Sequence, residues 1–317
     1  MLKKYFRKAL VTGGAGFIGS HIVEELLKQE IEVISIDNYL AGKTENLQHL
    51  KSLGDLHIVD CDITDMSSLA PHFEGVDIVF HNAASKKTVC LNDPRRDLSI
   101  NAEGSFNILE LSVKHKVKKV LHASTGSVYG EAQYFPQNEE HPLNPTSYYG
   151  VSKLAGEKYA LAFSKLYGLD TSIIRYFHVY GPRQDYSDAG GVVPIFGRKI
   201  LNGESPVIFG DGSQQRSFTF VKDVVRANFL VALHSGTKGQ AFNCASGIKV
   251  TISELAERVK RHFSVENLPI SYNDWTPGDI KIFDVDNQKL KSLGFEFVTP
   301  FDEGLALTLN WLRDYLQ

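Results

Sequence analysis

Thr12-Gly13-Gly14-Ala15-Gly16-Phe17-Ile18-Gly19 is the stretch of sequence that decides the fold. It joins a short apolar run, Lys8–Thr12, which is typical of a strand, to an amphipathic run, Gly19–Lys28, which is typical of a helix. Gly13 and Gly16 allow the backbone to turn sharply and to approach a pyrophosphate, and the first turn of the helix offers free N–H groups to the phosphates. The stretch therefore predicts a dinucleotide-binding loop.

An acid at the end of the next predicted strand specifies the dinucleotide. Asp37 closes the run Glu32–Asp37. A carboxylate there accepts hydrogen bonds from the ribose hydroxyls of NAD and repels the 2′-phosphate of NADP. The alternative is a tight turn in which Asp37 only caps a helix. The strand before the glycines, the helix after them and the acid favour NAD as the cofactor.

The first half of the chain alternates β-rich runs with amphipathic helical runs, which predicts an α/β fold with a parallel sheet covered on both faces. Further strands are expected at Leu56–Asp60, Ile78–Asn82, Lys119–Ser124 and Ile173–Phe177.

The pattern changes after Phe177, where a segment rich in Gly, Pro and Asp begins. Phe218–Leu233 is predicted to return to the first domain by a strand and a helix. Helices near Ile195–Leu201 and at Ile252–His262 and Phe301–Leu316 are predicted to form a smaller C-terminal lobe. We expect a cofactor domain of residues 1–177 and 218–245, and a substrate lobe of residues 178–217 and 246–317.

The composition excludes several classes of partner. The 317 residues carry a formal charge of −3, with 43% hydrophobic and 22% charged residues, so nucleic acid and anionic membranes are not expected partners. Three widely spaced cysteines suggest neither a disulfide framework nor a zinc site, and no metal is expected. We find no apolar run long enough for a signal peptide or a membrane span, so the cytoplasm is the expected location.

Tyr149 and Lys153 are the candidate chemical centre, because residues four apart project from the same face of a helix. A free tyrosine has a pKa of about 10, and a nearby ammonium would lower that pKa. Tyr149 could then remove a hydroxyl proton while hydride leaves the same carbon. The alternatives are a solvated helix face, or Tyr148 in place of Tyr149; the spacing to Lys153 favours Tyr149.

The glycine spacing Gly-x-x-Gly-x-x-Gly, followed by Cys61-Asp62-Ile63 and His81-Asn82-Ala83-Ala84, resembles the extended short-chain dehydrogenase/reductase family over nearly the whole chain. The resemblance implies a Rossmann-type doubly wound sheet with a smaller C-terminal substrate lobe. It also implies that Asp62 faces the adenine amine, that Lys153 binds the nicotinamide ribose and that Thr125 is the catalytic hydroxyl. With the motifs above, the expected cofactor-binding residues are Gly13, Gly16, Phe17, Ile18, Gly19, Asp37, Asn38, Asp62, Ile63, Ala83, Ala84, Lys86, Asn101, Ser124, Tyr149, Lys153 and Tyr176.

Thr125-Gly126-Ser127 distinguishes members of that family by reaction. Nucleotide-sugar 4,6-dehydratases have Asp-Glu directly after the threonine, and UDP-glucuronate decarboxylases tend to keep a Glu there. This chain lacks those acids, so it is most similar to UDP-hexose 4-epimerases, which are NAD-dependent isomerases. Lys86 also lies where those epimerases carry a lysine beside cofactor and substrate.

The resemblance implies that Arg216 binds the UDP phosphates, that Asp279 lies near the uridine ribose and that Val207 and Phe209 lie beside the uracil. His178 replaces the usual Asn or Thr and could bond phosphate or sugar. The expected substrate-binding residues are Lys86, Thr125, Ser127, Tyr149, His178, Val207, Phe209, Arg216 and Asp279.

Asp185 stands where UDP-glucuronate 4-epimerases tend to have an arginine, so a neutral, optionally N-acetylated UDP-hexose is preferred over a uronate. A UDP-glucuronate 4-epimerase, a nucleotide-sugar dehydratase or reductase and a non-catalytic NAD-sensing protein remain as alternatives. The resemblance also implies a homodimer through the helices around Asp93–Lys114 and Ser147–Tyr167.

Overall fold

A computed structural model describes residues 2–85, 87–275 and 281–317. Its centre is a seven-stranded sheet with the strand order β11-β6-β5-β4-β1-β2-β3. Every neighbouring pair in this sheet is parallel. The strands are β1 (Lys8–Thr12), β2 (Glu32–Asp37), β3 (Leu56–Asp60), β4 (Ile78–His81), β5 (Lys119–Thr125), β6 (Thr171–Tyr176) and β11 (Gln240–Cys244).

The strand order reverses between β1 and β4, which makes the sheet doubly wound. In such sheets a ligand binds in the crevice outside the carboxyl ends of the strands at the point of reversal. The predicted fold class is therefore confirmed, and the expected glycine loop lies at this crevice because it follows β1 directly.

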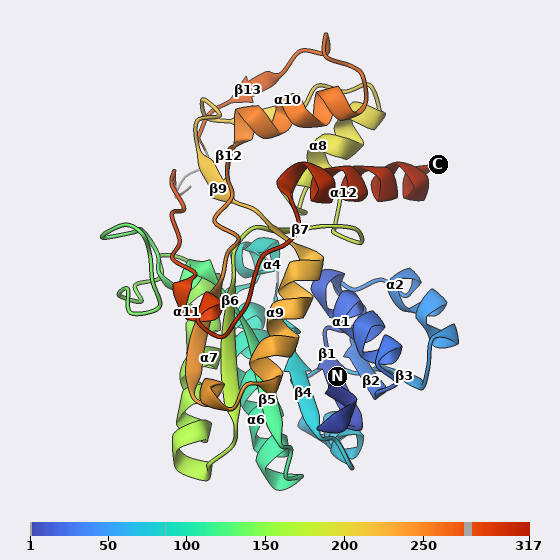
Figure 1. Ribbon diagram of the computed structural model, residues 1–317, viewed down its shortest axis with the longest axis vertical. Coiled ribbons are helices and arrows are strands. Elements are labelled where there is room, and N and C mark those ends of the chain that lie inside the picture. The colour runs from blue at the N-terminus through green and yellow to red at the C-terminus, as the bar shows by residue number, and fades with distance from the viewer. Residues whose placement is uncertain (1, 86, 276–280) are drawn as a thin grey trace.

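Helices cover both faces of the sheet (Figure 1). On one face lie α1 (Phe17–Lys28) and α9 (Val221–Leu233), and on the other α6 (Ser105–Lys114) and α7 (Tyr148–Tyr167). Successive strand residues face opposite layers: Ala9 and Val11 belong to the core under α1 and α9, whereas Leu10 belongs to the core under α6 and α7. Such double burial explains why these strands are apolar throughout.

The short helical segments are η1 (Leu2–Lys4), α2 (Glu45–Gln48), η2 (His49–Ser52), α3 (Met66–Leu69), η3 (Ala70–Phe73), α4 (Lys87–Asn92), α5 (Pro94–Leu98), η4 (Ser99–Gly104), η5 (Gly126–Val128), η6 (Ser235–Thr237) and α11 (Gln288–Lys291). One of them, η4, is a π-helix between α5 and α6. Because π-helices are rare and frequent at functional sites, η4 marks this region for attention.

A second lobe lies beyond the carboxyl ends of the strands, at the top of Figure 1. It contains α8 (Val192–Leu201), α10 (Ile252–His262) and α12 (Phe301–Leu316), which enclose an apolar core of their own. Three small sheets complete it: β7 (Val179–Tyr180) with β10 (Thr219–Phe220), β8 (Val207–Phe209) with β13 (Ser271–Asn273), and β9 (Gln215–Ser217) with β12 (Lys249–Thr251). The helix α10 begins with a complete capping box formed by Thr251 and Glu254.

Two segments differ from the sequence-based expectation. The strand predicted before α9 pairs with β7 rather than with the main sheet, and the strand that joins the main sheet is β11, after α9. Leu290 and Phe295 pack into the core under α1 and α9, although they follow residue 246, where we predicted the second lobe to resume. A polar residue, Asn243, is buried in the middle of β11 and weakens the apolar pattern of that strand.

In the described part of the chain, no helix has both the length and the apolar character needed to cross a membrane.

Candidate dinucleotide and catalytic site

The glycine loop has no room for side chains. Gly13 has φ +64, and a Cβ on it would lie 2.8 Å from the backbone nitrogen of Ala83. A Cβ on Gly19 would lie 2.1 Å from the carbonyl oxygen of Gly13. The turn therefore brings backbone against backbone at the start of α1, which is the arrangement a pyrophosphate requires.

A cavity of about 130 Å³ extends from this loop to the end of β2. Of the predicted cofactor residues, it is lined by Gly13, Gly16, Asp37, Asn38, Asp62, Ile63, Ala83 and Ala84. The carboxylate of Asp37 accepts hydrogen bonds from the backbone N–H groups of Ala15 at 3.0 Å and Tyr39 at 2.9 Å. Burial raises the pKa of Asp37, and these N–H bonds counteract that rise. The acid is thus fixed at the cavity wall.

Asp62 lines the same cavity, but its carboxylate is already engaged by protein groups. It accepts hydrogen bonds from the backbone N–H and the hydroxyl of Thr64 and from Asn38 Nδ2, and it forms an ion pair with Arg96. Burial raises the pKa of Asp62, but the bonds from Thr64, Asn38 and Arg96 lower it to about 2. The predicted contact of Asp62 with adenine stays a prediction.

A second cavity, of about 200 Å³, continues from the glycine loop to the predicted catalytic pair. Its predicted members are Gly13, Gly16, Phe17, Ile18, Gly19, Ala84, Ser124, Tyr149, Lys153 and Tyr176. Gly13, Gly16, Asn82 and Ala84 line both cavities. The two cavities therefore adjoin, and together their linings extend from Asp37 to Tyr149, as an extended dinucleotide would.

Tyr149 lies in the first turn of α7, which Ser147 caps by accepting a hydrogen bond from the N–H of Gly150 at 3.1 Å. Thr125, at the carboxyl end of β5, lies close enough to Tyr149 for its hydroxyl to lower the pKa of the phenol. Lys153, one turn further along α7, donates to the carbonyl oxygen of Ala123 at 2.6 Å. The structure thus brings the three predicted catalytic side chains to one place.

The pKa values of the pair differ from expectation in one respect. Burial raises the pKa of Tyr149 to about 12; the bond from Thr125 lowers it and the charge of Asp97 raises it. Burial lowers the pKa of Lys153 to about 8, against the opposing charges of Glu157 and Asp97. The predicted lowering of the tyrosine pKa is not present in the protein alone, because desolvation of the phenolate dominates.

Asn101 does not line either cavity. It is fully buried in η4, where its Oδ1 accepts a hydrogen bond from the N–H of Ser85 at 3.0 Å. Ser85 itself lines the first cavity, so Asn101 supports the cofactor loop from behind. Asn82 and Cys61 line the cavities within the two motifs that carry the family resemblance, although they were not named as cofactor-binding residues. Ser85 also lines the first cavity and was not predicted; its place in the loop after β4 is the signal that could have identified it.

Tyr176, at the end of β6, lines the second cavity and bonds through its hydroxyl to Asn228 at 3.1 Å. Ser127 follows in the 3-10 turn after Thr125, where its N–H donates to Thr125 Oγ1 at 3.2 Å.

Four of the predicted substrate residues, His178, Val207, Phe209 and Arg216, lie outside the main sheet, toward the second lobe. His178 has φ +39, and its ring contacts Phe283, with centroids 4.5 Å apart. The Arg216 guanidinium lies over the same Phe283 ring, 5.4 Å from the ring centroid. Burial, reinforced by the charge of Arg216, lowers the pKa of His178 to about 3, so its imidazole is neutral. Val207 and Phe209 lie on β8, and Phe209 is exposed. Lys86 and Asp279 lie outside the described residues.

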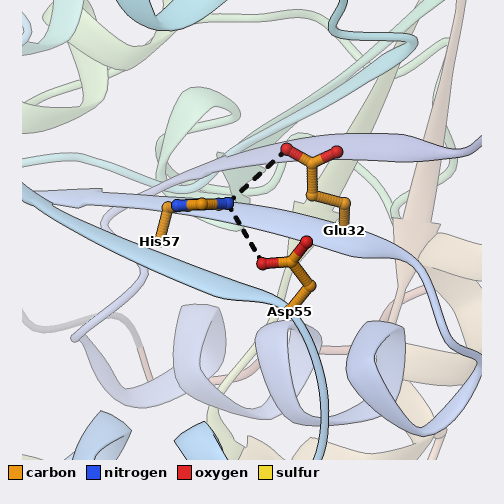
Figure 2. Close-up of side chains that lie close together, drawn as sticks. All are labelled: Glu32, Asp55 and His57. Carbon is orange, nitrogen blue, oxygen red and sulfur yellow. Dashed lines mark ion pairs between the residues drawn. The ribbon is translucent and has the colours of Figure 1, made fainter.

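A separate cluster of possible metal ligands, Glu32, Asp55 and His57, lies at the amino-terminal edge of the sheet (Figure 2). His57 Nε2 is 3.1 Å from Asp55 Oδ1 and 3.6 Å from Glu32 Oε1. The same Glu32 oxygen pairs with the Lys8 ammonium at 2.8 Å. The cluster is therefore an exposed ion-pair network that already holds a positive charge, at the end of the sheet opposite the cavities.

A backbone cradle without side chains, a fixed acid at the end of β2 and a contiguous cavity at the strand reversal are what a dinucleotide requires. The protein is thus of the Rossmann-type dinucleotide-binding class.

Residues 9–245 match the NAD dependent epimerase/dehydratase family, and the chain belongs to this family. The family assignment confirms both the resemblance and NAD as the cofactor. A UDP-glucose 4-epimerase of Mycolicibacterium smegmatis is 36% identical over 317 residues, 98% of this chain and 100% of that protein. A UDP-N-acetyl-α-D-glucosaminuronate decarboxylase of Bacillus cytotoxicus is 33% identical over 97% of this chain and 98% of that protein. The crystal structure of a UDP-glucose 4-epimerase of Thermotoga maritima with UDP-glucose superposes with a TM-score of 0.91 at 37% identity, covering 98% of this chain and 100% of that chain. These relatives are enzymes of nucleotide sugars, and they catalyse more than one reaction.

Proposed function

We propose that this protein interconverts the C4 epimers of a UDP-sugar by transient oxidation to a 4-keto sugar. The preferred substrates are the UDP-glucose/UDP-galactose pair or its N-acetylated counterpart. The observation that carries the proposal is the packing of Gly126, directly after Thr125.

A Cβ on Gly126 would lie 2.3 Å from Cε1 and 2.7 Å from Cδ1 of the buried Phe177 ring. Contacts that short do not occur between real atoms, so any side chain at position 126 would have to displace the buried Phe177 ring. Elimination of water needs an acid near the sugar, and the place directly after the catalytic hydroxyl has no room for one while Phe177 keeps its position. Oxidation and re-reduction need only the hydroxyl and the base, which supports epimerisation.

The roles of the chain's own residues follow from their positions. Bound NAD⁺ supplies the hydride acceptor. Tyr149 accepts the proton of the C4 hydroxyl, and Thr125, which lies beside Tyr149, orients that hydroxyl. Lys153 provides positive charge behind the nicotinamide ribose. Because the pKa of Tyr149 is about 12 in the protein alone, Tyr149 stays a phenol until further positive charge lies against it, and bound NAD⁺ carries such a charge.

The second lobe is suited to a neutral sugar on an anionic diphosphate. Arg216 and a neutral His178 form its polar pair beside Phe283. Arg183, a possible partner for a uronate carboxylate, forms an ion pair with Glu24 of α1 instead. This engagement and the acid at Asp185 favour a neutral hexose over UDP-glucuronate.

We further propose a homodimer through the face formed by α5, η4, α6 and α7. A surface cavity of about 590 Å³ lies on this face, lined by Leu98, Ala102, Phe106 and Tyr159, among others. Leu98 is 55% exposed and Val151, on α7, is 53% exposed. An apolar face of this extent is typical of a protein interface.

The purified enzyme should be incubated with UDP-glucose, UDP-N-acetylglucosamine and UDP-glucuronate without added cofactor, and the C4 epimers separated. An epimerase keeps its NAD and needs none added, whereas a reductase consumes a reduced cofactor stoichiometrically. Turnover of at least one neutral UDP-hexose is expected. No turnover of any UDP-sugar refutes the proposal, and release of CO₂ or a 4-keto-6-deoxy product would assign the alternative reactions.

Tyr149→Phe should retain bound NAD and lose turnover, because only the hydroxyl is removed. Tyr148→Phe is the matched control: Tyr148 is the adjacent residue, and its side chain is 62% exposed. Tyr148→Phe should keep both the bound NAD and the turnover. Full activity of Tyr149→Phe would place the base elsewhere.

A further inference from the structure

A buried carboxylate that the proposed reaction does not use lies behind the catalytic pair. Asp97, in α5, is 1% exposed. Its Oδ1 accepts hydrogen bonds from Ser85 Oγ and from Asn101 Nδ2 at 3.0 Å, and its Oδ2 accepts one from Ser152 Oγ at 2.6 Å. These donors are uncharged. Burial of a carboxylate is costly unless it is fully hydrogen-bonded, so this arrangement requires an explanation.

The three donors come from separate parts of the site. Ser85 belongs to the loop after β4 and lines the cofactor cavity. Ser152 lies in α7 between Tyr149 and Lys153, and it also lies 2.9 Å from Asn101 Nδ2. Asn101 lies in the π-helix η4. One carboxylate therefore fixes the cofactor loop and the catalytic helix to the same point.

The charge of Asp97 also acts on the groups that face it. On α7 it raises the pKa of Tyr149 and of Lys153. Glu157, on the same helix, raises the pKa of Lys153 as well, and the Cys90 thiol of α4 acts on Tyr149 in the same direction as Asp97. Lys153 is fully buried, so the two acids are what oppose the loss of its charge.

We propose that Asp97 is a positioning residue for the reaction: its carboxylate holds the loop of Ser85 and the helix of Tyr149 and Lys153 at a fixed spacing and keeps Lys153 charged. The inference rests on the proposed function, because it concerns the same catalytic pair. It adds an indirect member to the site, one that does not line either cavity.

The test is Asp97→Asn, which keeps the shape and removes the charge. Loss of the charge lowers the pKa of both Tyr149 and Lys153, so both limbs of the pH–rate profile should move toward lower pH by on the order of one unit. At the optimum of the wild type, kcat should fall by about tenfold. The KM for the UDP-sugar should stay within about twofold, since the expected nucleotide contacts lie in the other lobe. Unchanged limbs and unchanged kcat overturn the proposal.

A second readout does not depend on turnover. The absorbance of tyrosinate is measured against pH in the wild type and in Asp97→Asn, each with its bound NAD. Subtracting the same titration of the corresponding Tyr149→Phe protein isolates the ionisation of Tyr149. This ionisation should shift to lower pH in Asp97→Asn. If the wild type turns over no UDP-sugar, the proposed function fails, yet this titration still decides the role of Asp97. An unshifted titration refutes the inference.

Matched variants separate the effect of the Asp97 charge from that of its hydrogen bonds to Ser85 and Ser152, which we call the clamp. Glu74→Gln removes a carboxylate whose side chain is 90% exposed, and it should leave the profile unchanged. Ser152→Ala and Ser85→Ala keep the charge and each remove one hydrogen bond to Asp97 together with one from Asn101, so each should lower kcat by about threefold with unshifted limbs. If Asp97→Asn does not fold, these two variants carry the test, and wild-type kcat in both refutes the clamp.

Discussion

Replacing Gly126 by alanine tests the packing on which the proposed reaction depends. The new Cβ would lie 2.3, 2.7 and 2.9 Å from three ring atoms of Phe177. Phe177 is 2% exposed and stacks on Tyr129, with ring centroids 6.2 Å apart, so the ring cannot move away without disturbing a second buried aromatic. Overpacking of a core costs about 1–3 kcal/mol, and three simultaneous overlaps place this change near the upper end.

For a chain of this size the loss corresponds to a decrease in Tm on the order of 5 °C in scanning calorimetry. Gly54→Ala is the control, because the nearest atom to its Cβ would be Leu27 Cδ2, at an ordinary 3.4 Å. Gly126→Ala should also lower kcat, since the displaced backbone carries Thr125. Adding Phe177→Leu should recover part of the Tm. A Tm within about 1 °C of Gly54→Ala would refute the steric argument.

Three further predictions follow from the site. Turnover should fall about tenfold from pH 7 to pH 9, because the pKa of Lys153 is about 8 and its charged form is lost on that interval. Over pH 8–10 the contribution of Lys153 to the free energy of unfolding should rise, because the unfolded state keeps the Lys153 proton to a higher pH than the folded state. Urea unfolding at each pH measures this free energy, and a stability that falls together with the activity would contradict the assignment. Asp37→Asn should reduce the NAD that copurifies and allow NADP to bind; unaltered cofactor preference would remove Asp37 from the ribose site. Tyr159→Asp should convert a dimer to a monomer in light scattering, because it places a charge on the proposed interface; a persistent dimer would place the interface elsewhere.

Sequence patterns predicted the parts of the site that depend on local geometry. The glycines after β1 must lack side chains because backbone meets backbone there, and Tyr149 and Lys153 share a face because a helix repeats every 3.6 residues. Both constraints are visible in a few adjacent letters, so the cavity from Asp37 to Tyr149 could be anticipated.

The parts that were not predicted depend on contacts between distant residues. Nothing in the run Gln240–Cys244 shows that Asn243 satisfies its side chain with Tyr129 and with backbone carbonyls, which is what permits a polar residue inside the sheet. The network of Asp97 joins residues 85, 97, 101 and 152; the step from 97 to 101 is a helical spacing, but those to 85 and 152 follow no helical or strand period. The raised pKa of Tyr149 also could not be predicted from the sequence, because it reflects burial by segments far apart in the chain.

The placement of negative charge connects the reaction to the fold. Two buried acids, Asp97 of α5 and Glu157 of α7, act on Lys153 but do not line the cavity that ends at Tyr149. The position beside Thr125, where an acid would reach the sugar, is closed by Phe177. An acid in front of the base can protonate a leaving hydroxyl, whereas an acid behind it can only tune the pair. If this division decides the outcome, relieving position 126 with Phe177→Leu and introducing Gly126→Asp together with Ser127→Glu should produce a 4-keto-6-deoxy product that the parent enzyme does not release. Epimers as the only product would show that further residues decide the reaction.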